Sequence, residues 1–289
     1  MPFEVFLNQT ASGLLTGLVY GLSALGLSVI FGVVRIVNFA HGEMMVVAMY
    51  IALLLFQWLG LEPLLAVVPV AAILFLVGYG LQAGIINRLI DVPDTMQFLL
   101  LAAVGIVLTA GCMVIFGPDA RNVTLPYSYD SVEVGALLID KPRLLAGAAA
   151  LIISALLFLF FRFTRTGKQI RACADNIAGA RVVGLNVKRL YAISFGIGSM
   201  CIGAAGSIIL MLVDVHPYLA GQYTLLAFVI VIVGGMGSHA GALLGGVLIG
   251  VSEALAGLLL QPSLKTVFSY AILILVLLFR PQGLLGRRA

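Results

Sequence analysis

Long runs of apolar residues divide the chain into nine segments that are separated by short polar stretches. A helix needs roughly 20 mostly apolar residues to cross the hydrocarbon core of a membrane, and it satisfies its own backbone groups there. A transmembrane β-barrel would show short alternating segments instead. The pattern therefore predicts an all-α, polytopic bundle of about eight or nine spans, with broken or re-entrant helices near residues 34–43 and 234–241. The apolar segments are 11–33, 44–59, 64–86, 98–116, 144–161, 191–213, 225–235, 241–260 and 267–279, and the seventh is too short to cross without neighbouring residues.

Composition agrees with lipid as the solvent for most of the surface. Hydrophobic residues make up 62% of the chain and charged residues only 10%, whereas soluble domains are about a quarter charged. The basic residues lie in clusters without interleaved aromatic side chains, so nucleic acid is not expected as a partner. Cys112, Cys173 and Cys201 match no metal-ligand spacing, and neither do the three histidines, so no metal site is expected. The first ten residues lack the features of a cleavable signal, so the first span is expected to stay in the mature chain.

Loop charges predict the orientation of a single transmembrane domain over residues 1–289. Segment 162–189 is rich in lysine and arginine, and further arginines follow the last span, so both regions are expected in the cytoplasm. Loop 117–142 is mainly acidic and is separated from the basic segment by one span, which places it outside. The N-terminus lies outside if all nine segments cross the membrane, and inside if one of them does not.

Small residues recur four positions apart in several spans, a spacing that lets helix backbones approach closely in lipid. This pattern indicates a tightly packed bundle. The external loop also contains a stretch rich in β-forming residues, 122–139, where a short hairpin is possible. The clearest small-residue rows are Gly13, Gly17 and Gly21, and Gly246, Gly250 and Ala254.

The basic segment 162–189 is expected to contain a short amphipathic helix. Its polar face carries Lys168, Arg171 and Asp175, and Gly184 is placed to end the helix in the left-handed conformation. Such a helix can lie on the membrane, dock a partner or merely connect two spans. Docking is the favoured interpretation, because small side chains suit a protein groove better than lipid does. The small apolar face comprises Ile170, Cys173, Ala174, Ile177 and Ala180 or Arg181.

Two breaks between apolar runs, together with one isolated carboxylate, are candidates for a translocation pathway. The polar segment 35–43 either caps helices or lines a pore, since ionisable groups at membrane depth usually face the interior. The glycine-rich segment 234–241 is either a broken helix near the midplane or a tight surface turn. Glu253 lies inside an apolar run and should face the bundle interior and contact a hydrogen-bond donor. The candidate pathway residues are Asn38, His41, Glu43, Gly234, Gly235, Gly237, Ser238 and Glu253.

Four motifs in order make the chain resemble the LivH-type permeases, which are membrane subunits of high-affinity branched-chain amino acid ABC importers. No single motif is specific, but their order is, and the resemblance extends from Gly13 to Gly286. The motifs are Asn-Phe-Ala-His-Gly-Glu at 38–43, Gly167 followed by Ile-Arg-Ala at 170–172, the glycine-rich stretches 234–238 and 241–246, and Arg-Pro-Gln-Gly-Leu-Leu-Gly at 280–286.

This resemblance implies a multi-pass permease in a bacterial inner membrane. Its implied partners are a second permease, LivM-like or a second copy, two cytoplasmic ATPases and a periplasmic substrate-binding protein. The implied cargo is a branched-chain amino acid, with urea or short amides as alternatives. No cofactor is expected on this chain, because ATP would be hydrolysed by the partner subunits. The residues expected to couple the permease to the ATPases are Lys168, Arg171, Asp175, Asn176, Ala180 and Gly184.

Two rival functions stay open at this point. A secondary transporter or channel working alone fits the glycine breaks and Glu253, but few membrane-depth carboxylates are available to bind a coupling ion. A membrane enzyme is disfavoured, because no nucleophile and base are arranged in a known motif. Gly167 and Lys168 do not form a phosphate-binding loop, because Gln169 follows and no glycine stands five positions before Gly167. No catalytic residue is therefore expected.

Overall fold

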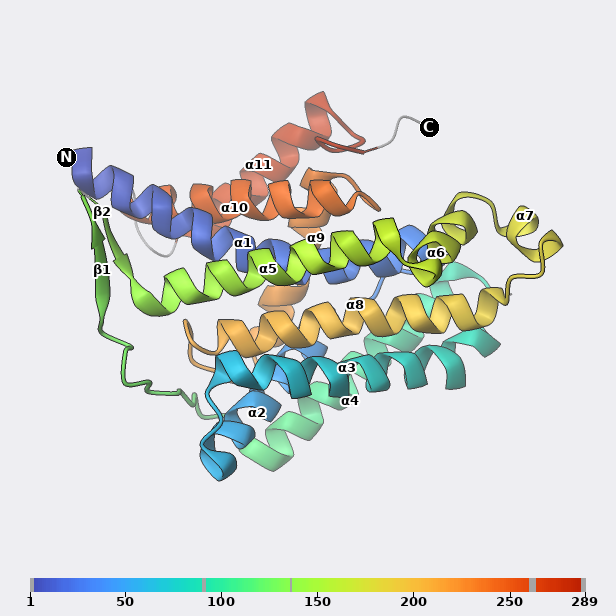
Figure 1. Cartoon of the computed structure of the whole chain (residues 1–289), viewed down its shortest axis with the longest axis horizontal. Helices are drawn as coiled ribbons and strands as arrows, with labels where there is room; N and C mark the ends of the chain where they lie inside the picture. The colour runs from blue at the N-terminus through green and yellow to red at the C-terminus, as the bar shows by residue number, and fades with distance from the viewer. Residues whose placement is uncertain (1–2, 90–91, 136, 260–263, 287–289) are drawn as a thin grey trace.

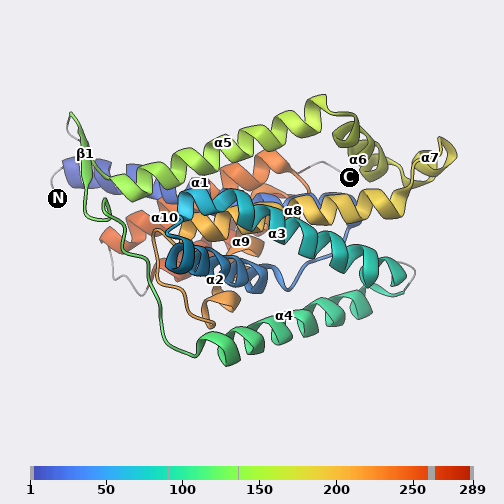
Figure 2. The ribbon, with the colours of Figure 1, turned by 60° about the horizontal axis from the view of Figure 1, so that its bottom comes forward.

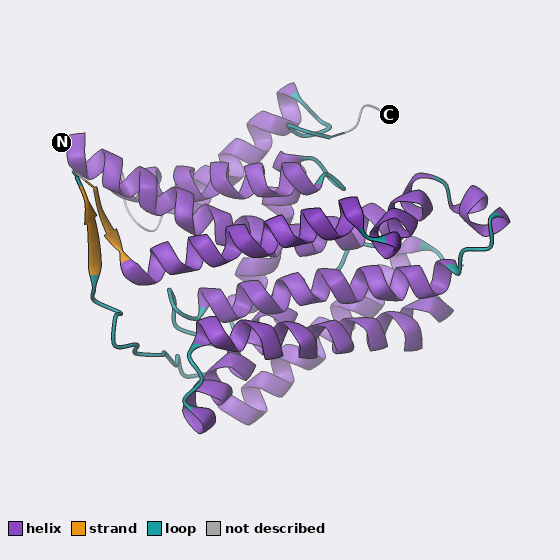
Figure 3. Cartoon of the chain, in the orientation of Figure 1, coloured by secondary structure: helices purple, strands orange, loops and turns teal. Residues whose placement is uncertain are grey.

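The computed structural model describes residues 3–89, 92–135, 137–259 and 264–286 of the chain. Helices make up most of it, and the described strands form a two-stranded hairpin at one end of the bundle (Figure 3). This architecture confirms the predicted all-α class. The helices are α1 (Phe3–Val34), α2 (His41–Leu59), α3 (Pro63–Gly84), η1 (Ile86–Arg88), α4 (Asp94–Phe116), α5 (Lys141–Phe163), α6 (Arg165–Asp175), α7 (Ile177–Val182), α8 (Val187–Ile209), α9 (Leu219–Gly234), α10 (His239–Leu259) and α11 (Lys265–Phe279), and the strands are β1 (Ser131–Val134) and β2 (Leu137–Asp140).

Every apolar segment predicted from the sequence is a helix. Seven of the described helices are long and apolar enough to cross a membrane, and α9 and α11 are shorter apolar helices. With 16 residues, α9 is about 24 Å long, somewhat less than the roughly 30 Å of a hydrocarbon core. The chain is therefore a polytopic membrane protein, as predicted.

Several helices begin before the apolar run that predicts them. The span predicted to start at residue 191 begins at Val187, because the Asn186 side chain accepts a hydrogen bond from Arg189 N at 3.0 Å and caps the helix. A hydropathy pattern stops at the first charged residues, whereas the backbone helix continues through them to its cap.

The core of the bundle lies around α1 and α8. In the most apolar 18-residue stretch of each helix, 78% of the residues are buried in α1 and 89% in α8, compared with 17% in α4. Helix α8 packs against α3 and α1, and α1 packs against α10 (Figure 1). Helix α4 lies apart along the edge of the bundle (Figure 2), so most of its surface is left for lipid or a partner.

Small residues bring α1 and α10 into backbone contact. A Cβ atom added to Gly17 would lie 2.8 Å from Val247 Cα, and one added to Gly250 would lie 2.6 Å from Gly13 O. Real Cβ atoms do not approach backbone so closely, so these positions accept glycine alone. The predicted rows of small residues therefore form a real helix–helix interface.

Loop contacts place three segments at the end of the bundle that carries the hairpin. The antiparallel pair β1–β2 confirms the hairpin predicted within 122–139. Leu138 N donates to Asn8 Oδ1 at 3.0 Å, so the start of α1 lies beside β2. Arg121 and Val215 form an isolated antiparallel bridge, so the α8–α9 connection lies there too. The N-terminal end of α1 is therefore on the same side as loop 117–142.

The opposite end of the bundle gathers the basic segments. Asn87 Nδ2 donates to Lys188 O at 3.1 Å, which joins the end of α3 to the start of α8. Leu285 N donates to Gly234 O at 2.9 Å, which joins the C-terminal segment to the α9–α10 turn. The connections between the described helices alternate between the two ends of the bundle, and the names outer end (with loop 117–142) and cytoplasmic end (with the basic segments) follow the loop-charge prediction.

Candidate functional site

The chain re-enters the bundle between α1 and α2. His41, the first residue of α2, has its Nε2 atom 3.0 Å from Ser23 Oγ, a hydrogen-bonded pair that is wholly buried. Ser23 precedes the inner end of α1 by eleven residues, so this contact lies about 16 Å inside that end. Residues 35–40 therefore run from the end of α1 back into the bundle, as the predicted re-entrant break near 34–43 requires.

Asn38 and His41 fix the shape of this re-entrant segment. Both side chains are fully buried. The Asn38 Oδ1 atom accepts a hydrogen bond from Ala40 N at 3.1 Å, which stabilises the turn just before α2. The two residues therefore fix the turn that leads into α2, although no side chain caps the first turn of that helix.

Glu43 lies where α2, α4 and α9 meet. Its Oε2 atom accepts a hydrogen bond from Thr224 Oγ1 at 3.1 Å, and the same Thr224 oxygen accepts from Gly42 N at 2.8 Å. A Cβ atom on Gly105 of α4 would lie 3.3 Å from the Glu43 carboxyl carbon. Thr224, which the sequence analysis did not single out, is thus the residue that ties α9 to the re-entrant segment.

The glycine-rich segment forms a tight turn between α9 and α10 at the cytoplasmic end. Gly235 and Gly237 both have positive φ angles, 106° and 78°. The C-terminal segment folds over this turn, where Leu284 N donates to Val233 O at 2.8 Å. Gly234 follows Thr224, the hydrogen-bond partner of Glu43, by ten residues of α9, or about 15 Å, so Gly234, Gly235, Gly237 and Ser238 lie at the end of the bundle and not beside Glu43.

A cavity of about 760 Å³ separates this turn from the predicted coupling helix. Lys168, Arg171 and Asp175 of α6 line one wall, and the turn that contains Ser238 lines the other. Arg35 also lines it and has a φ of 60°, a conformation that is uncommon for residues other than glycine. Three of the predicted coupling residues are therefore adjacent to the predicted glycine-rich segment.

Segment 162–189 contains two short helices, α6 and α7, which corrects the prediction of one. Asn176 interrupts it, because its Oδ1 atom accepts a hydrogen bond from Gly179 N at 2.8 Å and caps α7. An asparagine side chain competes with the helical backbone pattern in this way. Gly184 has a φ of 80° and ends α7 as predicted. The segment projects beyond the rest of the bundle (Figure 1).

The inner face of α6 is held by small and apolar side chains. Ile170 and Cys173 are fully buried, as the amphipathic pattern predicted, and Ala180 of α7 is buried as well. Burial raises the pKa of the Cys173 thiol, while nearby Arg181 opposes this effect, so the thiol is a packing group. At the tip, Val182 and Val183 expose 87% and 73% of their surface, although both are apolar.

Glu253 lines a second cavity, of about 570 Å³, between α1, α9, α10 and α11. Its Oε1 atom accepts a hydrogen bond from Ser269 Oγ at 2.7 Å. The prediction that Glu253 faces the bundle interior and contacts a donor is therefore confirmed. Of the predicted pathway residues, Glu253 shares this cavity with none of the others.

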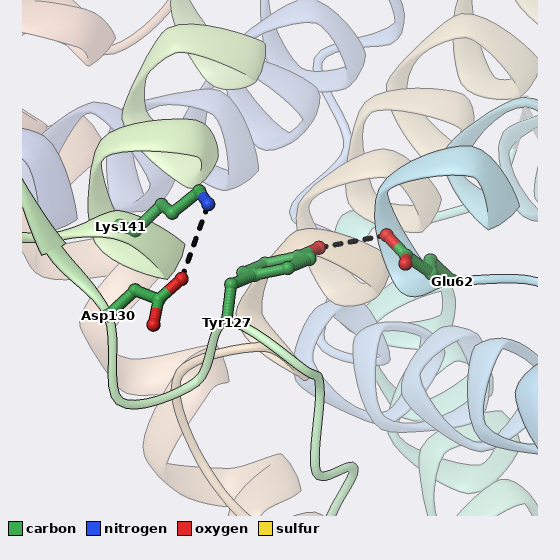
Figure 4. Close-up of polar contacts among 4 residues, drawn as sticks. All are labelled: Glu62, Tyr127, Asp130 and Lys141. Atoms are coloured by element: carbon green, nitrogen blue, oxygen red, sulfur yellow. Dashed lines mark hydrogen bonds and ion pairs between the residues drawn. The ribbon is translucent and has the colours of Figure 1, made fainter.

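On the outer side, loop 117–142 is fastened to the bundle by polar contacts (Figure 4). Tyr127 donates its hydroxyl to Glu62 Oε2 at 3.0 Å, at the turn between α2 and α3. Lys141, the first residue of α5, forms an ion pair with Asp130 at 3.3 Å, and its ammonium group lies over the Tyr127 ring. These contacts hold the loop across the outer ends of α2, α3 and α5.

Tyr127→Phe is expected to lower stability by about 1 kcal/mol, the usual contribution of one hydrogen bond. Burial, followed by the bond to Glu62, raises the pKa of Tyr127 to about 12 from its ordinary value of 10.0. The neutral phenol therefore stabilises the folded state below pH 10, and this contribution is lost as the pH rises towards 12. Thermal unfolding of the purified protein should show a higher Tm for the wild type than for Tyr127→Phe below pH 10, and this difference should disappear as the pH rises towards 12. Tyr129→Phe is the matched control, because Tyr129 is 93% exposed, and an equal effect of both substitutions would contradict the prediction.

The sequence of this chain is similar to known permeases over nearly its whole length. The family model described as "Branched-chain amino acid transport system / permease component" matches residues 9–277. The permease protein LivH of Salmonella typhimurium is 31% identical, covering 99% of this chain and 97% of LivH, and BraD of Pseudomonas aeruginosa is 30% identical, covering 98% and 96%. A solved structure of PsaBC from Streptococcus pneumoniae in complex with Fab is 16% identical, with a TM-score of 0.48 over 94% of this chain and 92% of that one. Because the family model and these permeases cover almost every helix described above, the chain belongs to the family of branched-chain amino acid transport system permease components.

Proposed function

We propose that this chain is the pore-forming permease subunit of an ATP-driven ABC importer in a bacterial inner membrane. The cargo would be a branched-chain amino acid or a similar small polar molecule, because the related permeases are named for branched-chain amino acid transport. The observation that carries the proposal is the projecting pair α6–α7, which buries Ile170, Cys173 and Ala180 against the bundle and exposes Val182 and Val183 at its tip. The chain itself would have no catalytic residue and no cofactor.

The partners follow from the surfaces that the chain leaves uncovered. Two cytoplasmic ATPases would bind below the permeases, and α6 and α7 of this chain would form its contact with them. The exposed pair Val182 and Val183 would be buried in that contact, since apolar side chains at a protruding tip favour a protein groove. A second permease, either LivM-like or another copy, would complete the pore. A periplasmic binding protein would deliver the substrate at the outer end, where loop 117–142 lies.

The structure also supports a physical route for coupling. Movement of α6 would act on the α9–α10 turn across the cavity that contains Arg171 and Ser238. Helix α9 extends from this turn to Thr224, which is hydrogen-bonded to Glu43. A shift of α9 along or about its axis would therefore change the contacts of the re-entrant segment near the midplane. ATP-driven closure below would in this way reorient helices within the membrane.

The test is a charge reversal on α6. Asp175→Arg is expected to reduce ATP-dependent uptake by about tenfold or more, since like charges placed across an interface cost several kcal/mol. Hydrolysis of ATP by the assembled complex should continue without productive transport. Uptake and hydrolysis are measured together in proteoliposomes that contain both permeases, the ATPases and the binding protein.

The milder variant Asp175→Asn serves as the control and should retain more uptake than the reversal. Wild-type uptake by Asp175→Arg in correctly assembled complexes would contradict the coupling role of α6. A complex that transports without ATP would reject the ABC importer as a whole.

A stand-alone secondary transporter or channel is the alternative, and the membrane-depth carboxylate of Glu253 favours it. In that case the purified chain alone, in liposomes, would accumulate substrate in response to a proton or sodium gradient. The importer proposed above instead requires that the chain alone be inactive.

A further inference from the structure

We infer that the cavity beside Glu253 is an outer substrate subsite in which this carboxylate binds the ammonium group of an amino acid. The inference rests on the proposed function, because it assigns a ligand group to the path of the same importer. The cavity, of about 570 Å³, lies within the roughly 300–1,000 Å³ range of small-molecule sites.

The cavity lies on the side from which a substrate would enter. Glu253 precedes the outer end of α10, Leu259, by six residues, or about 9 Å along the helix. Ser269 follows the outer end of α11, Lys265, by four residues, or about 6 Å. A molecule released at the outer face would therefore reach this carboxylate before it reached Glu43, which lies near the midplane.

The Glu253 carboxylate has one occupied oxygen. Ser269 Oγ donates to Oε1, and no described residue donates a hydrogen bond to Oε2. A carboxylate at membrane depth is costly unless a cation or further donors reach it. The Lys265 side chain lies beside Gly257, one helical turn further out, and forms no ion pair with Glu253 in the described structure. A primary ammonium, with three donors, supplies what the carboxylate lacks.

The remaining walls of the cavity match the other parts of an aliphatic amino acid. Helix α9 contributes Leu225, Leu226 and Val229, which form an apolar wall for a branched side chain. The hydroxyl groups of Thr266 and Tyr270 on α11 are uncharged donors suited to a carboxylate. Urea and short amides have no ammonium group, so this lining favours amino acids over the alternative cargo.

Glu43 provides a built-in comparison. It is also a half-buried carboxylate at membrane depth that accepts one hydroxyl hydrogen bond, from Thr224 to Oε2, but Gly105 of α4 packs against it and it lines neither of the two cavities described above. A ligand that binds at Glu253 should therefore leave Glu43 unaffected.

The first experiment measures binding without relying on transport. A hydrophobic carbodiimide is allowed to modify the carboxyl groups of the assembled importer in proteoliposomes, and mass spectrometry quantifies the adducts on Glu253 and Glu43. Leucine should protect Glu253 several-fold and leave the modification of Glu43 unchanged. Equal modification of Glu253 with and without saturating leucine would overturn the inference.

The second experiment measures uptake. Glu253→Gln keeps the shape of the side chain and an acceptor for Ser269, and it should reduce leucine uptake about ten- to hundredfold, which corresponds to the loss of one charge-assisted hydrogen bond. Lys265→Gln should retain uptake, as should Ser252→Ala, whose hydroxyl bonds only to its own helix at Leu248 O. Equal losses in Glu253→Gln and Lys265→Gln would show that Glu253 serves a structural ion pair and would overturn the inference.

The two proposals fail in different ways. A wild-type complex that takes up no branched-chain amino acid would refute the proposed cargo, and the ammonium subsite with it. A wild-type complex that takes up leucine, together with unchanged uptake by Glu253→Gln, would refute the subsite alone.

Discussion

Gly246→Val should leave almost no correctly folded protein. A Cβ atom at this position would collide with the backbone of Gly21 and lie 2.7 Å from Gly17 O. Neither contact can be relieved by rotating a side chain, because both partners are backbone atoms of α1. Association of helices in lipid depends on close van der Waals packing, so separating α1 from α10 removes the main source of their stability.

The expected cost exceeds the usual 1–3 kcal/mol of an overpacked site, because two whole helices must move apart. Size-exclusion chromatography and thermal unfolding of the detergent-solubilised protein would show aggregation or a large fall in Tm. Gly80→Val is the matched control, since a Cβ atom on Gly80 meets nothing within 4 Å. If Gly246→Val and Gly80→Val unfold at the same temperature, the α1–α10 interface is not as tight as described here.

Gly235→Val should abolish transport while the protein still inserts. The φ angle of Gly235 is 106°, which costs a valine on the order of 1–3 kcal/mol. Its Cβ atom would also lie 2.7 Å from Gly286 Cα and 3.0 Å from the carbonyl carbon of Leu285. The C-terminal segment would therefore be pushed away from the α9–α10 turn, next to the cavity that faces α6.

Gly60→Val separates the two causes of this loss. Gly60 has a φ of 64°, but a Cβ atom there meets nothing within 4 Å, so the variant carries backbone strain without a collision. ATP-dependent uptake in proteoliposomes should be retained in Gly60→Val and lost in Gly235→Val. If both variants transport equally well, close approach of the C-terminal segment is not required for function.

Sequence patterns predicted the elements of this fold much better than its contacts. Each apolar run became a helix, because a backbone in lipid has few other ways to satisfy its hydrogen bonds. The amphipathic pattern placed Ile170 and Cys173 on the buried face of α6 correctly. It missed the break at Asn176, because periodicity continues through a residue whose side chain caps the next helix.

The candidate pathway was predicted as one group and is found at three depths. Asn38, His41 and Glu43 lie near the midplane, the glycine-rich turn lies at the cytoplasmic end, and Glu253 lines an outer cavity. Polar and glycine residues show that a segment departs from a plain span, but spacing along one chain does not give its depth. Thr224 was missed for the same reason, because a single threonine in an apolar helix carries no signal of its own.

The sequence by itself determined that this protein is a multi-pass membrane protein, which segments are apolar helices and which family the motifs resemble, and it predicts which loops are cytoplasmic. These properties follow from the local cost of burying charge and backbone groups in lipid, and each run of residues bears that cost separately. Only the tertiary structure decided that Glu43 meets Thr224, that Gly246 meets Gly21, and that Glu253 faces a cavity. Such contacts join residues that are far apart in the chain, and they depend on how the helices pack together, which no single helix encodes.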